Sequence, residues 1–324
     1  MNSRAVVQDA SRPLMPLWAA LLVAAASGPI MDAGFPALGW WPLTFVGIGV
    51  FLVTLIGRRL GSAFLVGFVG GMTYYLIQIL WASLFLGPIP MTALSTLESL
   101  FVGLGAMLIT LAYRVVPRVW SSRFGRMGLL PLVIAGLWTL REAVASVWPY
   151  GGFSWARVAE SQSQSPFSSL FSWIGISGVS FVMVWLVALT IEAIRMASLA
   201  RLTRVALVVT ALALVLVVPA FPVALKGSTT VAVVQGDGPA GYFDPHYYGD
   251  LLAAQFNATR PLVGKKVDMV IWPEGASDID PIKADGATDW NLAATEFNDV
   301  SKTLHAPLIA GTITHRGDKF YNTS

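Results

Sequence analysis

The chain has 324 residues, of which 55% are hydrophobic and 12% are charged, and its mean hydropathy is +0.67. This composition excludes an ordinary soluble protein and indicates an integral membrane protein. The net charge is +3, but the sequence has no stripe of basic residues interleaved with aromatic residues, so we do not expect nucleic-acid binding.

The apolar character is unevenly distributed along the chain. Residues 1–225 hold nearly all the long apolar runs, whereas residues 226–324 have the composition of a soluble domain and carry most of the acidic side chains. We therefore expect a helical transmembrane domain at 1–225 and a water-facing domain at 226–324. The absence of cysteine excludes disulfides, thiolate metal sites and thiol catalysis within these residues.

The first part contains about seven segments that are long and apolar enough to be membrane spans, each of which needs roughly 20 residues. The first segment ends near Gly28-Pro29 and also resembles a signal peptide with Ala24–Ala26 as its cleavage region. We favour a retained anchor helix, because six spans follow it. The predicted spans are 14–31, 41–57, 61–82, 91–113, 128–148, 168–194 and 205–224.

Charged residues in the loops predict the orientation of this bundle. Basic side chains gather in every second loop, while the alternate loops hold Asp32, then no charge, then Arg157 with Glu160. The positive-inside rule predicts a cytoplasmic N-terminus, and an odd number of spans puts the residues after 225 outside. The basic residues on the predicted inner side are Arg4, Arg12, Arg58, Arg59, Arg114, Arg118, Arg123, Arg126, Arg195, Arg201 and Arg204.

Glu98 lies deep inside the fourth predicted span, and Arg141 and Glu142 lie deep inside the fifth. Charges at membrane depth are costly and usually face a protein interior or a wet cavity. They indicate either a polar lining beneath a substrate site or a structural role, as an internal ion pair or as snorkelling groups near a helix end, and the sequence favours neither. The G-x-x-x-G spacings Gly57/Gly61 and Gly67/Gly71 predict close helix packing rather than a function.

The segment Trp148–Trp155, W-P-Y-G-G-F-S-W, lies between the fifth and sixth spans on the predicted outer side. Its composition favours an interfacial aromatic belt. The alternative is a loop at the membrane surface that shapes an opening for lipid tails.

The second part alternates strand and helix patterns. Runs of β-branched and apolar residues that end at turn residues predict strands, and apolar residues at helical spacing predict helices. This alternation implies an α/β domain in which helices cover a buried sheet. The predicted strands are 229–235, 267–272, 307–314 and 320–324, and the predicted helices are 248–262 and 288–304.

Glu274 immediately follows the second predicted strand, in V-D-M-V-I-W-P-E (267–274). Enzymes of the α/β class commonly build their sites at strand ends. A glutamate held rigidly and partly desolvated there has a raised pKa, which suits a general base. An arbitrary strand-end glutamate is more often a surface carboxylate, and this pattern by itself favours that interpretation.

Other chemical motifs are missing from the sequence. The three histidines, His246, His305 and His315, have no metal-ligand spacing. There is no G-x-S-x-G, no Walker loop, and no G-x-G-x-x-G between a strand and a helix. We therefore expect neither a metal nor a cofactor.

Taken together, the chain resembles the apolipoprotein N-acyltransferases, which are membrane-anchored members of the nitrilase superfamily. The resemblance extends over the whole chain, from several N-terminal spans to an outside nitrilase-like (CN hydrolase) domain of αββα sandwich type, here incomplete. Its strongest segments are V-A-V-V-Q-G-D-G-P (231–239), N-A-T-R-P-L-V-G-K (257–265), I-W-P-E (271–274) and G-F-S-W (152–155).

The resemblance implies the transfer of a fatty acyl chain from a phospholipid to the amino group of an S-diacylglyceryl cysteine at the N-terminus of a lipoprotein. It implies a Glu-Lys-Cys mechanism through a thioester, at the outer face of the bacterial cytoplasmic (inner) membrane. Carried over by position, Glu274 is the catalytic base, and Phe243 and Trp155 contact the substrate. The lysine and the cysteine are expected beyond Ser324, so we expect a fragment of a longer protein that is inactive by itself.

Three other functions stay open at this point. A membrane-anchored amidase of the same superfamily would share Glu274 but would use water as the acceptor. A transporter or scaffold would use Arg141, Glu142 and Glu98 as a transport path and would tolerate Glu274→Gln. A naturally shortened chain would bind lipid without catalysis.

Overall fold

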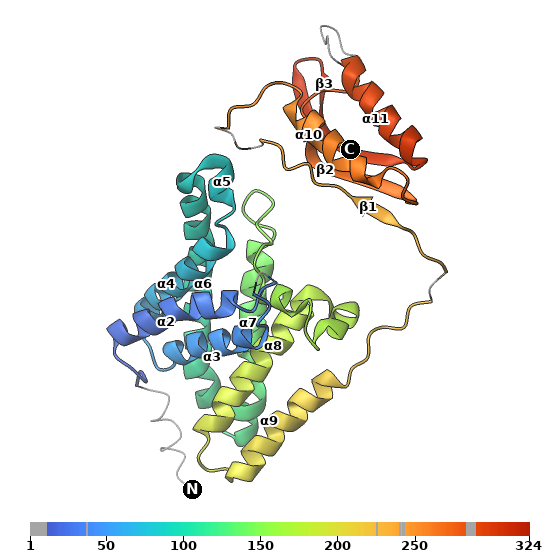
Figure 1. Cartoon of the computed structure of the whole chain (residues 1–324). Coiled ribbons are helices and arrows are strands. Elements are labelled where there is room, and N and C mark those ends of the chain that lie inside the picture. Colours follow the sequence, from blue (N-terminus) through green and yellow to red (C-terminus); the bar gives the residue numbers. More distant parts are fainter. Residues whose placement is uncertain (1–11, 37, 225, 240, 242–243, 283–289) are drawn as a thin grey trace. The chain divides into compact units, whose positions relative to one another are not determined.

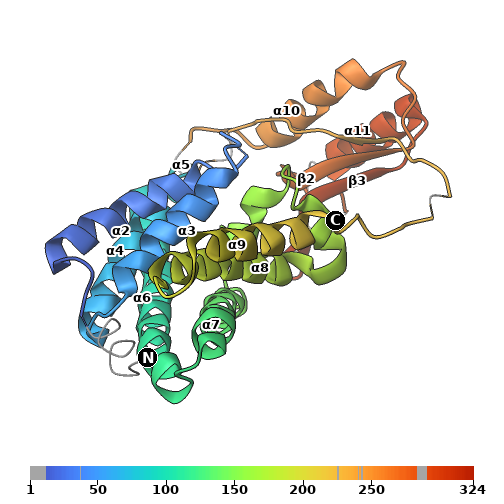
Figure 2. The same ribbon diagram turned by 90° about the horizontal axis from the view of Figure 1, so that it is seen from below.

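The computed structural model describes residues 12–36, 38–224, 226–239, 241, 244–282 and 290–324, and Figures 1 and 2 show it in two orientations. The chain divides into two compact units. The first unit comprises Met1–Ser83 and Gly87–Pro222, and the second comprises Val223–Ser324 together with Leu84–Leu86.

The first unit is built of helices, and proline in the first turn opens three of them, α3, α6 and α7. Proline suits this position because its missing N–H would have no partner inside the helix. The main helices are α2 (Leu17–Asp32), α3 (Pro42–Leu55), α4 (Leu60–Gln78), α6 (Pro88–Val119), α7 (Leu130–Ala145), α8 (Phe171–Arg195) and α9 (Arg201–Leu216), and the short α5 (Ala82–Leu86) is divided between the two units. A π-helical turn (Gly125–Leu129) precedes α7, and two 3-10 turns (Val158–Gln162 and Ser168–Leu170) precede α8.

The helical membrane part predicted from the sequence is confirmed. Within the described residues, four helical stretches are long and apolar enough to cross a membrane: Leu60–Gln78, Pro88–Val119, Gly125–Ala145 and Ser168–Arg195. The other three predicted spans contain shorter helices, of 16 residues in α2, 14 in α3 and 16 in α9. At 1.5 Å per residue these reach only about 21–24 Å, less than the roughly 30 Å of a hydrocarbon core. The count of seven spans therefore stays a prediction.

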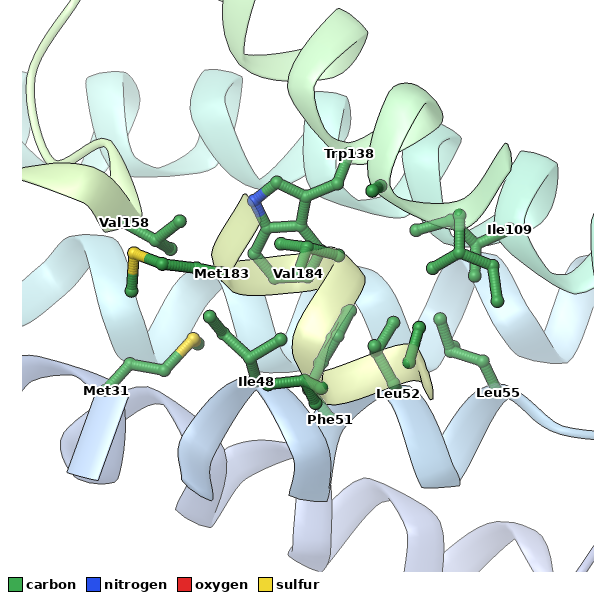
Figure 3. Packing of buried hydrophobic residues seen from close by; sticks show 14 of the residues in the cluster. Met31, Ile48, Phe51, Leu52, Leu55, Ile109, Trp138, Val158, Met183 and Val184 are labelled. Carbon is green, nitrogen blue, oxygen red and sulfur yellow. The ribbon is translucent and has the colours of Figure 1, made fainter. Parts of the chain in front are cut away.

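The core of the first unit lies where α2 and α3 pack against α7 and α8. Figure 3 shows Phe51 of α3 among aliphatic side chains, beside Trp138 of α7. The rings of Phe51 and Trp138 meet edge to face with centroids 5.8 Å apart, and both side chains are buried. Such contacts among fully buried aromatic and aliphatic side chains fix how the helices cross.

Helices α4 and α6 approach so closely that glycine is required between them. A Cβ atom on Gly67 would lie 2.6 Å from the Cβ of Ala106 and 2.9 Å from the Cα of Gly103. One turn further on, a Cβ atom on Gly71 would lie 3.0 Å from Val102. In contrast, a Cβ atom on Gly61 would meet nothing within 4 Å. Of the two G-x-x-x-G spacings, only Gly67/Gly71 forms a close helix contact.

The second unit is a four-stranded mixed sheet in the order β1-β2-β3-β4. The strands are β1 (Val231–Val233), β2 (Met269–Ser277), β3 (Leu308–Arg316) and β4 (Lys319–Thr323). The first three run parallel, and β4 returns antiparallel to β3 through a hairpin at Gly317, whose φ of +62° favours glycine. The crossovers carry α10 (Asp250–Thr259), a 3-10 turn (Arg260–Leu262) and α11 (Trp290–Leu304).

Both crossover helices cover the same face of this sheet. Helices α10 and α11 contact each other, and both views show them on one side of the strands. Right-handed crossovers between sequentially ordered parallel strands place their helices this way. The side chain of Trp272 in β2 is buried beneath them. Its Nε1 donates to Thr259 Oγ1 at 2.9 Å, and its ring meets Phe297 edge to face.

The opposite face of the sheet is apolar and exposed. Val231 and Val233 of β1 are 42% and 75% exposed, and Ile309 and Ile313 of β3 are both 43% exposed. Alternation along a strand puts these side chains on the face that points away from Trp272 and the helices. An apolar sheet face of this kind normally packs against another layer.

The boundaries of the elements differ from the sequence predictions in one important place. The second strand does not end at Trp272 but continues to Ser277, because its pairing with β3 resumes at Ser277 opposite Thr312. Glu274 therefore lies inside β2 rather than beyond it. The first strand is shorter than predicted, since only Val231–Val233 pairs with β2.

We predict that Gly67→Ala destabilises the first unit, by about 1–3 kcal/mol, because the new methyl group overlaps the backbone and side chains of α6. The matched control is Gly61→Ala on the same helix, where the space is open. Thermal unfolding in detergent should show a lower midpoint for Gly67→Ala and an unchanged or higher one for Gly61→Ala. Equal midpoints for the two variants would contradict the close contact.

Candidate functional site

Glu274 lies at a break in the register of the parallel sheet. Trp272 pairs with Ala310, and the next paired residue of β2 is Ser277, opposite Thr312. The four residues Pro273–Ala276 thus lie opposite the single residue Gly311. Extra residues in one strand bend it and redirect a side chain. Because of this bulge, the side chain of Glu274 does not follow the regular alternation of side chains between the two faces of the sheet.

Two glycines make the bulge possible. Gly275 has φ of +67°, in the left-handed region that other residues rarely adopt. A Cβ atom on Gly311 would lie 2.4 Å from the carbonyl oxygen of Pro273 and 2.7 Å from the Cα of Glu274. The backbone of β3 therefore passes directly against the bulge, and only glycine leaves room for it.

The carboxylate of Glu274 is exposed and accepts a hydrogen bond from Nδ2 of Asn322 on β4. This exposure matches the surface carboxylate that the sequence pattern by itself favoured, and none of the described residues covers this side of the bulge. The carboxylate is nevertheless fixed in place, by the bulge beneath it and by the amide of Asn322 beside it.

The turn after β2 is tied to β3 by a buried carboxylate, Asp280. It accepts hydrogen bonds from the backbone N–H of Ile282 at 2.8 Å and of His315 at 2.7 Å, and its Oδ2 lies 3.2 Å from the His315 ring nitrogen. Burial acts to raise the pKa of Asp280, but these hydrogen bonds and the neighbouring imidazole outweigh it and lower the pKa. The end of β2 that follows Glu274 is therefore fixed.

Trp155 belongs to the first unit and lines a cavity of about 780 Å³. Its Nε1 donates to the carbonyl oxygen of Gln78 at 3.1 Å, and its ring lies against that of Trp81. The Gln78 side chain in turn donates to Asp32 at 2.7 Å. The cavity is mainly apolar with a few acidic and amide groups, as is common for sites that bind small amphipathic molecules. Its lining includes Asp32, Phe35, Gln78, Trp155, Glu160 and Phe171.

A buried carboxylate, Glu142 of α7, holds the segment that follows Trp155. It accepts hydrogen bonds from the indole N–H of Trp138 at 2.9 Å and from the backbone N–H of Val158 at 3.2 Å. The guanidinium groups of Arg141 and Arg157 each lie 3.7 Å from one of its oxygens. A charge this deeply buried is tolerated only when it is paired and hydrogen-bonded.

A second set of contacts completes this attachment. The Tyr74 hydroxyl of α4 donates to the carbonyl oxygen of Ala156 at 2.9 Å, and Glu160 accepts from the N–H of Ala156 at 3.1 Å. Burial raises the pKa of Glu160, while its hydrogen bonds from Arg157 and Ala156 act to lower it. The segment after Trp155 is thereby fixed to both α4 and α7.

Glu98, Arg141 and Glu142 belong to one internal network. Arg141 donates to the Tyr75 hydroxyl at 3.1 Å, and Tyr75 is in turn hydrogen-bonded to the buried Glu98. None of Glu98, Arg141 and Glu142 lines the cavity at Trp155. Of the two interpretations left open by the sequence, the structure therefore supports the internal ion pair. A transport path would require the three groups to face one cavity, whereas the small cavity of about 10 Å³ that Arg141 lines is not lined by Glu98 or Glu142.

The three predicted site residues have different outcomes. Glu274 and Trp155 are in the described residues, in the second and first units respectively, while Phe243 lies outside the described residues. The described ranges contain no group of three or more metal-ligating side chains. Gly311 and Asn322 were not identified from the sequence. An isolated glycine within a predicted strand, as at Gly311, is a known signal for a bulge. No comparable signal in the sequence pointed to Asn322.

We predict that Asp280→Asn destabilises the second unit by about 1–3 kcal/mol at neutral pH, because it removes charge-assisted hydrogen bonds from two backbone N–H groups and an imidazole. The lowered pKa of Asp280 determines how this stabilisation depends on pH. The stabilisation is complete above the unfolded-state pKa of about 3.9 and is lost as pH falls through the lower folded-state value.

Unfolding midpoints of the parent and of Asp280→Asn should therefore differ at pH 7, and the difference should shrink progressively as the pH falls below about 3.9. Asp318→Asn, at the tip of the exposed β3–β4 hairpin, is the control and should show no difference at either pH. A gap between parent and Asp280→Asn that persists undiminished in acid would contradict the assigned role of the Asp280 charge.

Comparison with known proteins connects this architecture to a family. The family model described as the apolipoprotein N-acyltransferase N-terminal domain matches residues 27–189. The apolipoprotein N-acyltransferase of Haemophilus influenzae is 24% identical over 79% of this chain and 49% of its own length. The proteins of the same name from Azotobacter vinelandii and Mycolicibacterium smegmatis are each 27% identical, over 95% and 91% of this chain and 60% and 52% of their own lengths. The chain spans about half the length of the curated relatives it matches, and it belongs to the apolipoprotein N-acyltransferase family.

Proposed function

We propose that the chain supplies the membrane anchor and the catalytic base of an apolipoprotein N-acyltransferase. The observation that carries the proposal is the fixed, exposed carboxylate of Glu274, which the bulge in β2 presents beside Asn322. The substrates in this proposal are a phospholipid acyl donor and a lipoprotein whose N-terminal residue is S-diacylglyceryl cysteine. Both substrates carry acyl chains that lie in the membrane. A reaction domain attached to a helical membrane unit suits such substrates.

In the proposed first step, the Glu274 carboxylate takes the proton of a cysteine thiol. The thiolate attacks the ester carbonyl of the phospholipid, and a lysine stabilises the oxyanion that forms. The ester C–O bond breaks, the protonated Glu274 returns its proton to the departing lysophospholipid alkoxide, and a thioester remains. We place the cysteine and the lysine in the part of the relatives' length that this chain does not span.

In the proposed second step, the neutral α-amino group of the diacylglyceryl cysteine attacks the thioester carbonyl. The C–S bond breaks, an amide forms, and the proton lost by the amine passes through Glu274 to the cysteine thiolate. The enzyme is thereby restored. An amine acceptor, rather than water, distinguishes this reaction from that of an amidase of the same superfamily.

The proposed domains are a membrane domain at 1–225 and, at 226–324, a domain of the nitrilase-like αββα type. The exposed apolar face formed by Val231, Val233, Ile309 and Ile313 supports this architecture. A second sheet with its own helices would pack on this face at about 10 Å. It would also bring a covering layer to the region of Glu274.

The proposed location is the bacterial inner membrane, crossed seven times, with the second unit on the extracytoplasmic side. The alternation of arginine-rich loops supports this orientation. The short helices α2, α3 and α9 would require local thinning of the bilayer or interfacial flanking residues. In this arrangement Trp155 and the cavity of about 780 Å³ beside it are available to a lipid from the outer leaflet.

The decisive experiment is Glu274→Gln in the full-length protein. Gln has the same shape but cannot accept a proton, so we expect thioester formation to fall by about 10²–10⁴-fold. Glu296→Gln on α11 removes the same charge from the same unit and should leave the rate unchanged. Acyl-enzyme is measured by protein mass spectrometry, and transfer by the mass of a diacylglyceryl peptide. Unchanged acylation in Glu274→Gln would refute the proposed base.

The role of Trp155 is tested by substitution with alanine. We expect Trp155→Ala to raise KM for the phospholipid several-fold with a smaller effect on kcat, because the indole lines the cavity without approaching the reacting groups in this proposal. Trp120→Ala is the matched control, since Trp120 is 50% exposed and Trp155 48%. If both variants changed KM equally, Trp155 would have no specific part in binding.

A further inference from the structure

Two apolar grooves lie end to end along the contact between α8 and α9. Figure 1 shows the two helices leaving the turn at 196–200 as the arms of a V. One groove, of about 340 Å³, lies near that turn, and the other, of about 360 Å³, lies further along the same helices. Thr190 and Val208 line both grooves, so the two form one continuous feature, here called the α8–α9 groove.

The α8–α9 groove is apolar over almost its whole length. On α9 its lining follows helical spacing through Val205, Val208, Leu212 and Leu216, which places these side chains on one face of the helix. At 1.5 Å per residue, the 16 residues of α9 extend about 24 Å. An extended fatty acyl chain is comparable in length. Aromatic side chains, Trp41, Phe45 and Phe167, line the end that is remote from the turn.

The end of the groove nearest the turn is cationic. Arg201 and Arg204 both line it, from the first turn of α9. The Nη1 of Arg204 donates to the carbonyl oxygen of Ile194 at 3.1 Å, which fixes its guanidinium across the groove. Its Nε is buried and has no acceptor among the residues that the structure describes. A buried donor without a partner calls for an acceptor supplied from outside the chain.

The start of α9 adds to this positive potential. No side chain caps the helix, so the first N–H groups lack an intrahelical or side-chain partner at that end. The partial positive charge of a helix N-terminus favours a phosphate, as do two guanidinium groups. The α8–α9 groove thus combines a long apolar stretch with a cationic end.

We propose that the α8–α9 groove binds an anionic phospholipid, with the phosphate at Arg201 and Arg204 and one acyl chain along the apolar stretch. Basic pockets between membrane helices recognise phospholipid headgroups in this way. The site differs from the cavity at Trp155, because α8 runs from the segment after Trp155 to the turn at 196–200, and the arginines lie at its far end. It does not depend on the proposed transferase activity.

The experiment measures lipid binding to the full-length protein in a neutral detergent by native mass spectrometry. Phosphatidylglycerol and phosphatidylcholine with the same acyl chains are the probes. We expect the parent to bind phosphatidylglycerol about tenfold more tightly than phosphatidylcholine. Arg204→Gln should remove this preference by weakening phosphatidylglycerol binding about tenfold. The control Arg123→Gln removes an exposed arginine from another predicted inner loop and should stay within twofold of the parent.

Two further variants test the two halves of the site separately. Arg201→Gln, at an exposed side chain, should weaken phosphatidylglycerol binding several-fold, and it decides the question of charge if Arg204→Gln does not fold. Val208→Trp fills the groove where its two halves meet and should weaken binding of both lipids. Equal binding of the two lipids by the parent would overturn the proposal. Binding of inorganic phosphate as tight as that of phosphatidylglycerol would also overturn it, since the acyl chain would then contribute nothing to the affinity.

Discussion

The buried carboxylate of Glu142 is the interaction on which the arrangement of the first unit most depends. It lies on a helix in an apolar bundle and is only 3% exposed, so its charge must be balanced from within the protein. The balance comes from Arg141 on the same helix and from Arg157 and Val158 in the segment after Trp155. Removing one partner would leave an uncompensated charge, which explains why this segment is held firmly against the bundle.

A different constraint governs the second unit, where backbone geometry rather than charge positions the candidate catalytic group. The register break between β2 and β3 leaves four residues opposite Gly311, and the side chain of Glu274 leaves the sheet at that point. The rest of β2 is immobilised by Trp272 beneath the helices and by Asp280 at the turn. A carboxylate on such a support keeps its position without a flexible loop.

Much of the fold could be predicted from the pattern of residues. The helical membrane part, the change in composition near 225, and the strand–helix alternation after it follow from hydrophobic periodicity, which acts locally. The position of Glu274 within β2 could not be predicted, because Trp-Pro resembles a strand end and the strand resumes only through pairing with Thr312. The exposure of its side chain depends on which layers cover the sheet, and the pattern of consecutive residues does not specify those layers.

The sequence by itself determined that this is a membrane protein of the apolipoprotein N-acyltransferase family, because composition, spans and short motifs are properties of consecutive residues. Only the tertiary structure decided that Glu98, Arg141 and Glu142 belong to one buried network, that Gly67 but not Gly61 lies at a close helix contact, and that Asn322 meets Glu274. These are contacts between residues far apart in the chain. They depend on how helices cross and strands align, and the local pattern at either residue carries no record of its partner.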